Sequence, residues 1–419
     1  VVGNPVKRNT LIGIISGSLC CTPLVQLVFV SRYFSEATME KAKVVLLPCS
    51  NYDEEAVYMA IRRGLAMLGG LERFVSPQEH ILVKPNLLKN AAPDKAVTTH
   101  PSVFGAMLRC LREDGFDKLS YGDSPGPAAS LEHAVEESGL RAQAEKYGAV
   151  LGDFSGAETV EFPDGRVCKK FMLCREVKKA DAVISLCKMK THALENITGA
   201  VKNQYGCIYG SYKAAGHAMY PNSRTFADML CDLNRCVAPR LYLMDGIIAM
   251  EGNGPASGTP KSMKVLLLSS DPVALDSVFA KLVFLDAHHV PTCVSGAKNG
   301  LGRMEYSEIT ILTPDGEIST EEAAEKYGDP GFEVHRKNAT FWRVRSLLPA
   351  ARKYSDRPAV DPEQCIGCGI CQQACPVDGQ AVHSGHGQKA VYNYKKCIRC
   401  YCCQEMCPVG AITRKQVRG

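Results

Sequence analysis

Eight cysteines near the C-terminal end carry the clearest chemical pattern in this 419-residue sequence. They stand in two runs of equal spacing, Cys365-x-x-Cys368-x-x-Cys371-x-x-x-Cys375-Pro376 and Cys397-x-x-Cys400-x-x-Cys403-x-x-x-Cys407-Pro408. Three cysteines separated by pairs of residues let a loop surround one 4Fe-4S cubane, while the fourth, before proline, ligates the other cubane. The spacing predicts two 4Fe-4S clusters. Cys365, Cys368, Cys371 and Cys407 would hold one, and Cys397, Cys400, Cys403 and Cys375 the other.

Two other uses of cysteine fit this pattern less well. A zinc ribbon also pairs C-x-x-C motifs, but it takes four ligands and has no Cys-Pro ending on each run. A disulfide framework is typical of short secreted chains, and this chain is long. The other twelve cysteines show no regular spacing. We therefore expect them to be reduced thiols, which indicates a cytoplasmic protein.

The two runs belong to an internal repeat with an offset of 32 residues. Asp361–Val377 and Asn393–Val409 share eight identities, four of which are not cysteines: Ile366/Ile398, Gln372/Gln404, Pro376/Pro408 and Val377/Val409. Identity beyond the ligands argues for a duplicated fold. Residues 357–419 are similar to the bacterial two-cluster ferredoxins. This resemblance implies a small α+β domain.

The preceding part of the chain alternates short apolar runs with amphipathic stretches. Such alternation predicts an α/β domain with a mixed or parallel sheet. We expect helices over 54–68, 102–113 and 131–146. The expected strands are Val44–Leu47, Ile81–Lys84, Leu119–Tyr121, Ala182–Leu186, Leu241–Met244 and Val265–Leu268.

Polar residues follow several of these strands, where ligands of α/β sheets bind. A lysine ends one strand at Lys84, just before Asn86, and Asp123 follows another. The densest stretch, residues 187–206, begins right after the strand that ends at Leu186, and it contains Lys188, Lys190, His192 and Lys202. If residues 199–208 formed one helix, Gly199, Lys202, Asn203 and Gly206 would share a face suited to a phosphate or carboxylate. The alternative is a helix whose glycines only pack against a neighbour.

These segments resemble domain-of-unknown-function family 362. The resemblance is carried by the residues around Lys84, Asp123, Lys190–His192, Thr198–Asn203, Asp245 and Ser270–Asp276. It covers roughly residues 39–310 and implies a bacterial or archaeal cytoplasmic iron–sulfur protein with no established reaction. We therefore divide the chain into an extension (1–38), an α/β domain (39–312), a bridge and linker (313–356) and the ferredoxin-like domain (357–419).

Charge and hydropathy narrow the range of partners. The net charge of +5 is small for this length and forms no basic stripe, so we expect no nucleic-acid partner. Residues 11–30 lack charge but contain several polar residues. Membrane attachment is expected only if this stretch is a true anchor. The other interpretation is that residues 1–38 precede a natural start at Met39.

Our first hypothesis is an oxidoreductase component that exchanges electrons with a partner protein. A small anionic substrate would bind at a site built from Lys84, Asn86, Asp123, Lys188, Lys190, His192, Lys202 and Asp245. The catalytic candidates are Lys84, Asp123, Lys190, His192 and Lys202, with His192 and Asp123 or Asp245 handling protons. The alternatives are a redox-sensing or ligand-binding module with structural clusters, and non-redox group transfer on a carboxylate or phosphate.

Overall fold

The computed structural model describes residues 41–126, 129–336 and 356–415. The described residues from Lys41 onward form one compact unit. The extension at 1–38, with its uncharged stretch at 11–30, and most of the bridge at 337–355 lie outside the described residues. Within the described ranges, no helix is long and apolar enough to cross a bilayer. The domain boundaries at 312 and 356 stay predictions.

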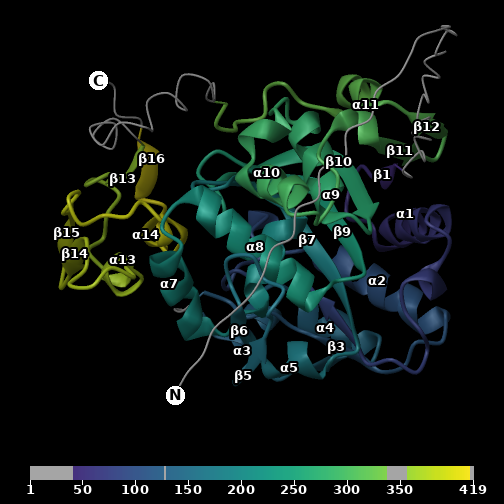
Figure 1. Cartoon of the computed structure of the whole chain (residues 1–419), viewed down its shortest axis with the longest axis horizontal. Coiled ribbons are helices and arrows are strands. Elements are labelled where there is room, and N and C mark those ends of the chain that lie inside the picture. Colours follow the sequence, from purple (N-terminus) through teal and green to yellow (C-terminus); the bar gives the residue numbers. More distant parts are fainter. Residues whose placement is uncertain (1–40, 127–128, 337–355, 416–419) are drawn as a thin grey trace, which may run out of the picture. The chain divides into compact units, whose positions relative to one another are not determined.

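The first three quarters of the chain contain twelve strands and eleven α-helices among the described residues (Figure 1). The strands are β1 (Ala42–Pro48), β2 (Ile81–Lys84), β3 (Leu119–Tyr121), β4 (Val150–Leu151), β5 (Ala157–Glu161), β6 (Lys170–Cys174), β7 (Ala182–His192), β8 (Asn196–Thr198), β9 (Leu241–Glu251), β10 (Thr259–Ser269), β11 (Ile309–Thr313) and β12 (Gly316–Ile318). The helices are α1 (Glu54–Met67), α2 (Pro101–Glu113), α3 (Leu131–Glu137), α4 (Leu140–Lys146), α5 (Arg175–Lys179), α6 (Ala200–Asn203), α7 (Gly210–Met219), α8 (Ser223–Val237), α9 (Pro272–Leu282), α10 (Pro291–Lys298) and α11 (Thr320–Tyr327).

One large sheet organises this region, in the order β12-β11-β1-β10-β9-β7-β2-β3-β4, with β8 paired to β7. β2, β3, β4, β7 and β9 run parallel to one another, whereas β10 is antiparallel to both β1 and β9. The sheet is therefore mixed, which confirms the predicted α/β class. Because β2, β3 and β7 are adjacent and parallel, the residues that follow them meet at one edge of the sheet.

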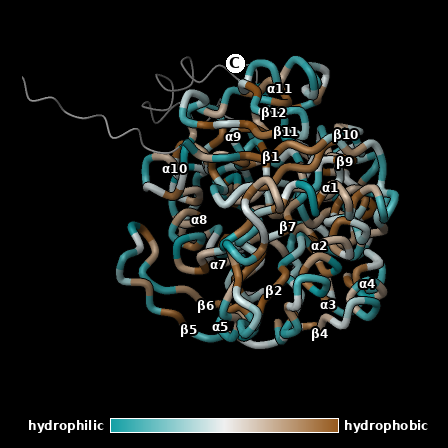
Figure 2. The backbone as a smooth tube through the Cα atoms, turned by 90° about the vertical axis from the view of Figure 1, so that its right-hand side faces the viewer, coloured by the Kyte–Doolittle hydropathy of each residue, from teal (hydrophilic) through white to brown (hydrophobic). Residues whose placement is uncertain are grey.

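Side chains alternate between two cores on opposite faces of the sheet, as the period of two in a strand requires. In β1, Val44 and Leu46 pack into one core, which also receives residues of α8, α9 and α10. Val45 and Leu47 pack into the other core, together with residues of α1, α2 and α4. Figure 2 shows hydrophobic colour along β1, β9 and β10. Strands buried on both faces read as continuous apolar runs, which explains why the sequence revealed them.

The C-terminal region has its own small α+β fold. Two strand pairs form it, β13 (Arg357–Val360) with β16 (Ile412–Lys415) and β14 (Val382–Gly385) with β15 (Gln388–Tyr392). Each cysteine run contains one short helix, α13 (Ile370–Gln373) in the first and α14 (Cys402–Glu405) in the second. The predicted α+β class is confirmed.

Two expected helices differ from the structure. The helix expected over 131–146 is broken into α3 and α4 at Gly139, which has φ +74°. Such a left-handed conformation suits glycine and ends a helix. The helix expected over 199–208 is wrong, because α6 ends at Asn203 and only a 3-10 turn, Gln204–Cys207, follows. Lys202 and Tyr205 both face the cavity described below.

Candidate functional site

Three cysteines of the first run and the last cysteine of the second line one small cavity. These are Cys365, Cys368, Cys371 and Cys407, and they make up the set that the ligand spacing predicts for one cluster. We call them the outer set. Cys368 is exposed at the surface, and among the eight cysteines it alone is exposed.

The remaining four cysteines are the inner set, Cys397, Cys400, Cys403 and Cys375. Sulfurs of this set accept hydrogen bonds from neighbouring groups. The Tyr392 hydroxyl donates to Cys403 Sγ at 3.3 Å, and the Ala381 backbone N–H donates to Cys375 Sγ at 3.2 Å. Hydrogen bonds to sulfur stabilise thiolates and tune the potentials of iron–sulfur clusters.

The donor chemistry of both sets fits iron–sulfur cubanes. All eight donors are thiols, and seven of them are buried or half-buried. No group of three or more described His, Cys, Asp or Glu side chains is arranged to hold one metal ion. A 4Fe-4S cluster takes its thiolates one to each iron. When bound, such a cluster supplies or accepts single electrons.

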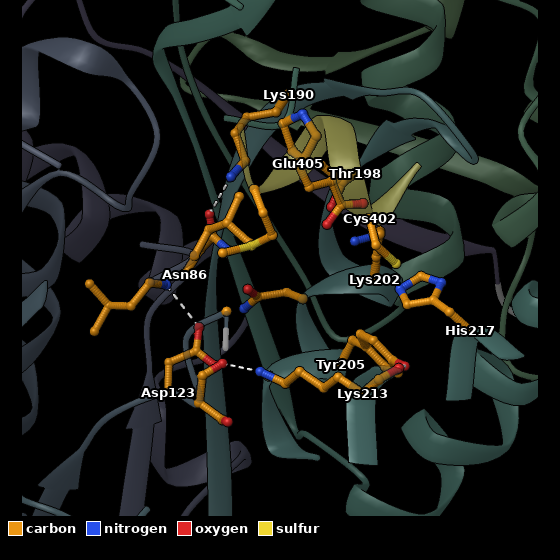
Figure 3. Close-up of a pocket in the computed structure, with 18 of the residues that line it drawn as sticks. Asn86, Asp123, Lys190, Thr198, Lys202, Tyr205, Lys213, His217, Cys402 and Glu405 are labelled. Atoms are coloured by element: carbon orange, nitrogen blue, oxygen red, sulfur yellow. Dashed lines mark hydrogen bonds between the residues drawn. The ribbon is translucent and has the colours of Figure 1, made fainter. Parts of the chain in front are cut away.

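A second cavity lies where the polar strand ends meet, and we call it the strand-end cavity (Figure 3). The α/β region and the C-terminal region both contribute to its lining. Its walls are Asn86, Leu87, Leu88, Asp123, Ser124, Gly126, Lys190, Thr198, Lys202, Asn203, Tyr205, Gly206, Lys213, Ala214, His217 and Pro255, together with Ala374, Cys402, Glu405 and Met406.

The strand-end cavity is small. The space available to the centres of water-sized groups is about 90 Å³. It therefore suits a compact molecule and not a nucleotide. The backbone at Gly206 packs closely against Asp123 and Lys84 and so narrows the cavity. A Cβ at Gly206 would lie 1.7 Å from Asp123 Oδ1 and 2.8 Å from Lys84 Nζ, so only glycine fits there.

Two of the candidate lysines have carboxylate partners. Lys84 Nζ lies 3.0 Å from Asp123 Oδ1, and it is completely buried beneath the cavity wall. Lys188 Nζ donates to Asp245 Oδ2 at 2.7 Å and to the Tyr52 hydroxyl at 2.8 Å. A buried charge is tolerated when it is paired in this way. These pairs hold the strand ends together, and neither Lys188 nor Asp245 lines the cavity.

The other two candidate lysines lack such compensation. Lys190 Nζ donates to Asn86 Oδ1 at 2.7 Å and to the Val97 carbonyl at 2.8 Å, both neutral acceptors. Burial, together with the nearby charges of Lys202 and Lys188, lowers the pKa of Lys190 to about 7. The Lys202 side chain is half-buried and makes no hydrogen bond or ion pair with a described residue, although, against the effect of burial, its charge lowers the pKa of the nearby Glu405 carboxyl. An ammonium group without a partner in a concave site is suited to hold an anion.

His192 lies behind the cavity wall. Its Nδ1 accepts hydrogen bonds from the backbone N–H groups of Leu194 and Glu195, both at 3.1 Å. Its Nε2 lies 2.7 Å from Glu405 Oε1, and Glu405 does line the cavity. Burial lowers the pKa of His192 to about 4. This histidine is therefore neutral near pH 7. Its Nδ1 is held by the backbone, and its Nε2 lies against Glu405 without a well-formed hydrogen bond.

Helix α7 contributes two cavity residues that the sequence analysis missed, Lys213 and His217. Burial lowers the pKa of Lys213 to about 8, and its Nζ donates to the carbonyls of Ser124 and Pro125. His217 is buried and stacks on Phe226, with ring centroids 4.4 Å apart, and its Nδ1 has no hydrogen-bond partner among the described residues. The i, i+4 spacing of Lys213 and His217 on one helical face was the available signal.

Helix α14, which carries the inner-set ligand Cys403, packs directly on the α/β region. Gln404 is fully buried, and its side-chain amide donates to Asn253 Oδ1 at 2.8 Å and to the Gly254 carbonyl at 3.0 Å. Arg414 of β16 donates to the Ala193 carbonyl at 2.8 Å. In Figure 3, Cys402 and Glu405 enter the cavity from the yellow ribbon of the C-terminal region. The inner set therefore lies beside the strand-end cavity.

Fold and site together define a 4Fe-4S iron–sulfur protein with an α/β domain. The model of a 4Fe-4S dicluster domain matches residues 357–408. The model described as domain of unknown function (DUF362) matches residues 81–281. A thylakoid-associated protein of Synechocystis sp. is 34% identical over 259 residues, which is 62% of this chain and 79% of that protein. The chain belongs to the DUF362 family, with a C-terminal 4Fe-4S dicluster domain.

Two solved structures show a more distant similarity. The lactate racemase apoprotein of Thermoanaerobacterium thermosaccharolyticum has 12% identity and a TM-score of 0.37, over 54% of each chain. A Thermotoga maritima protein has 12% identity and a TM-score of 0.33, over 58% of this chain and 59% of its own. This chain thus spans somewhat more than half the length of each.

Proposed function

We propose that this protein is an oxidoreductase component that binds two 4Fe-4S clusters and exchanges single electrons with a small anion in the strand-end cavity. One observation carries the proposal. The unpaired Lys202 and the inner-set helix α14 line the same cavity. In a purely structural domain there would be no need for an anion-binding lysine to share a cavity with a helix that carries a cluster ligand.

The cavity residues have separable roles in this proposal. Lys202 binds the anion, and Lys190 adds a second cationic N–H when it is protonated. Asp123, paired with Lys84, orients the loop after β2 by accepting the Leu87 backbone N–H at 2.8 Å. His217, whose Nδ1 is unpartnered, handles a proton in place of His192, which serves to position Glu405. The size of the cavity limits the substrate to a small carboxylate, a phosphate or a comparable anion.

The partner that exchanges electrons with the clusters would approach at the outer set. Ile366, which lies between two outer-set ligands, is 58% exposed, and Val409 is 40% exposed. Together with Cys368 these side chains form an open apolar surface at the cysteine cavity. Electron-transfer encounters use small interfaces, so a patch of this kind is sufficient for a carrier protein.

We also propose a reducing compartment, the cytoplasm, as the location. Buried, unpaired cysteines such as Cys110, Cys187 and Cys293 support it. The Synechocystis relative is described as thylakoid-associated, so association with a membrane is the competing outcome. Fractionation of cells that express the full chain decides between the two.

The test starts from protein purified and reconstituted without oxygen. The expected result is about eight irons per chain, together with two reducible 4Fe-4S signals in electron paramagnetic resonance. Small carboxylates and phosphate are then screened for binding by calorimetry and for oxidation of the reduced clusters. Binding without any electron exchange would favour the ligand-sensing alternative. Clusters that cannot be reduced at biological potentials would contradict the proposal.

A further inference from the structure

We infer that anion binding at Lys202 and reduction of the inner cluster oppose each other, so that a bound anion makes the inner cluster a stronger reductant. This inference rests on the proposed function and deepens it, because it states how the substrate site and the electron site control one another. It concerns the inner set alone.

The first support is a shared wall. Helix α14 provides Cys402 and Glu405 to the lining of the strand-end cavity. Cys402 stands between the inner-set ligands Cys400 and Cys403, and the α14 backbone is continuous with both. A charge on the inner set is therefore carried by ligands that are next in sequence to residues lining the cavity. The outer set lines a different cavity and adjoins the wall of the strand-end cavity only through Met406, which precedes Cys407, whereas the inner set adjoins it through both Ala374 and Cys402.

The second support is that charged side chains of both regions line this cavity. Lys202 comes from α6 of the α/β region, and Glu405 comes from α14 of the C-terminal region. Glu405 Oε1 also lies 2.7 Å from His192 Nε2 of β7. A charge on α14 and the ammonium group on α6 therefore face the same small space.

Reduction adds one negative charge on the inner-set side of α14. An anion beside Lys202 carries charge of the same sign, so the two repel. At about 10 Å and an effective dielectric constant of about 20, one unit charge on each side changes affinity by on the order of tenfold. Because the site is partly buried, salt weakens this repulsion less than it would at an exposed surface.

The coupling must be reciprocal. If reduction weakens anion binding tenfold, the anion shifts the reduction equilibrium of the inner cluster by the same factor. When the anion is bound, the reduced inner cluster is a stronger electron donor than it is when the anion site is empty. This arrangement favours transfer to a bound substrate over loss of the electron when the site is empty.

The experiment uses the full chain with both clusters reconstituted, and sulfate is the probe anion. Calorimetry measures sulfate affinity for the oxidised protein and for protein reduced by light and deazaflavin, a method that adds no competing sulfur oxyanion. The expected result is an affinity about tenfold weaker in the reduced state. A potentiometric titration followed by paramagnetic resonance should show one cluster shifting to lower potential with sulfate, while the other stays constant.

A matched pair of lysine variants completes the test. Lys202→Gln should abolish the sulfate-induced shift, and Lys298→Gln, at an exposed residue of α10 outside the cavity, should preserve it. Equal sulfate affinity in both redox states, equal shifts in both clusters, or a shift that survives in Lys202→Gln would overturn the inference. Absence of sulfate binding to the oxidised protein contradicts the proposed anion site itself, and the inference with it.

Discussion

The two cysteine runs share their spacing but lie in different surroundings. Gln372 and Gln404 are identical residues at equivalent positions of the repeat. Gln372 accepts a hydrogen bond from Ser384 N within the C-terminal region, whereas Gln404 donates to Asn253 and Gly254 of the α/β region. The first run faces solvent through Cys368, and the second packs against the strand-end cavity. One half of the duplication reaches the surface, and the other half lines the strand-end cavity.

The differences between the runs follow this division. Ile370 and Gln373 of the first run correspond to Cys402 and Glu405, which line the cavity in the second. The backbone shows the same divergence. Gly369, with φ +81°, corresponds to Tyr401, which adopts φ +63° despite its side chain. A non-glycine residue in this conformation costs about 1–2 kcal/mol. The buried Tyr401 ring must therefore provide packing that a glycine would lose.

The largest expected effect separates the two sets through their exchanged ligands. Cys375→Ala should remove the inner cluster although Cys375 belongs to the first run, and Cys407→Ala should remove the outer cluster. Each variant should lose about four of about eight irons per chain. Iron analysis measures the loss, and the sulfate sensitivity of the remaining signal identifies which cluster is left. A sulfate-sensitive signal that persists in Cys375→Ala would contradict the crossed assignment.

Removal of the cavity cation should have the next largest effect. Lys202→Gln should weaken sulfate binding by about 1.5–3 kcal/mol, because a charged donor is lost from a partly buried site. Calorimetry on the oxidised protein measures the change. Lys298→Gln serves as the control and should change the binding free energy by less than about 0.5 kcal/mol.

The equivalent glutamines compare the two halves directly. Gln404→Ala leaves buried acceptors at Asn253 and Gly254 without a donor, and it should destabilise the protein by about 1–3 kcal/mol. Gln372→Ala removes a hydrogen bond at a half-buried position and should cost about 0.5–1.5 kcal/mol. Denaturant unfolding without oxygen measures both. Equal losses would mean that α14 does not depend on its α/β contacts.

The smallest effect is a pH dependence of the cavity. Because the pKa of Lys190 is lowered to about 7, this lysine is cationic below that pH and neutral above it. Sulfate affinity should therefore fall as pH rises through about 7, by on the order of 1 kcal/mol. In Lys190→Gln the fall across this window should disappear. A profile that is unchanged in this variant would assign the dependence to another group, with Lys213 the next candidate.

Local sequence patterns by themselves determined much of this protein. Ligand spacing alone predicted the two cysteine sets, since cluster geometry ties sequence separation to chemistry. Continuous apolar runs predicted the strands of the mixed sheet, and the order of parallel strands made a polar edge expected at Asn86, Asp123 and Lys190. Only short-range regularities were needed for these conclusions.

Tertiary structure alone decided which of the polar residues work together. Lys84 and Lys188 form ion pairs with carboxylates, the described residues give Lys202 no such ion pair, and His192 lies against Glu405. The cavity also takes Cys402 and Glu405 from a region some 200 residues further along the chain. Pairing of charges and docking of α14 depend on long-range packing, for which a single sequence has no local signal. The physical reason is that an ammonium group's role is set by its neighbours in space.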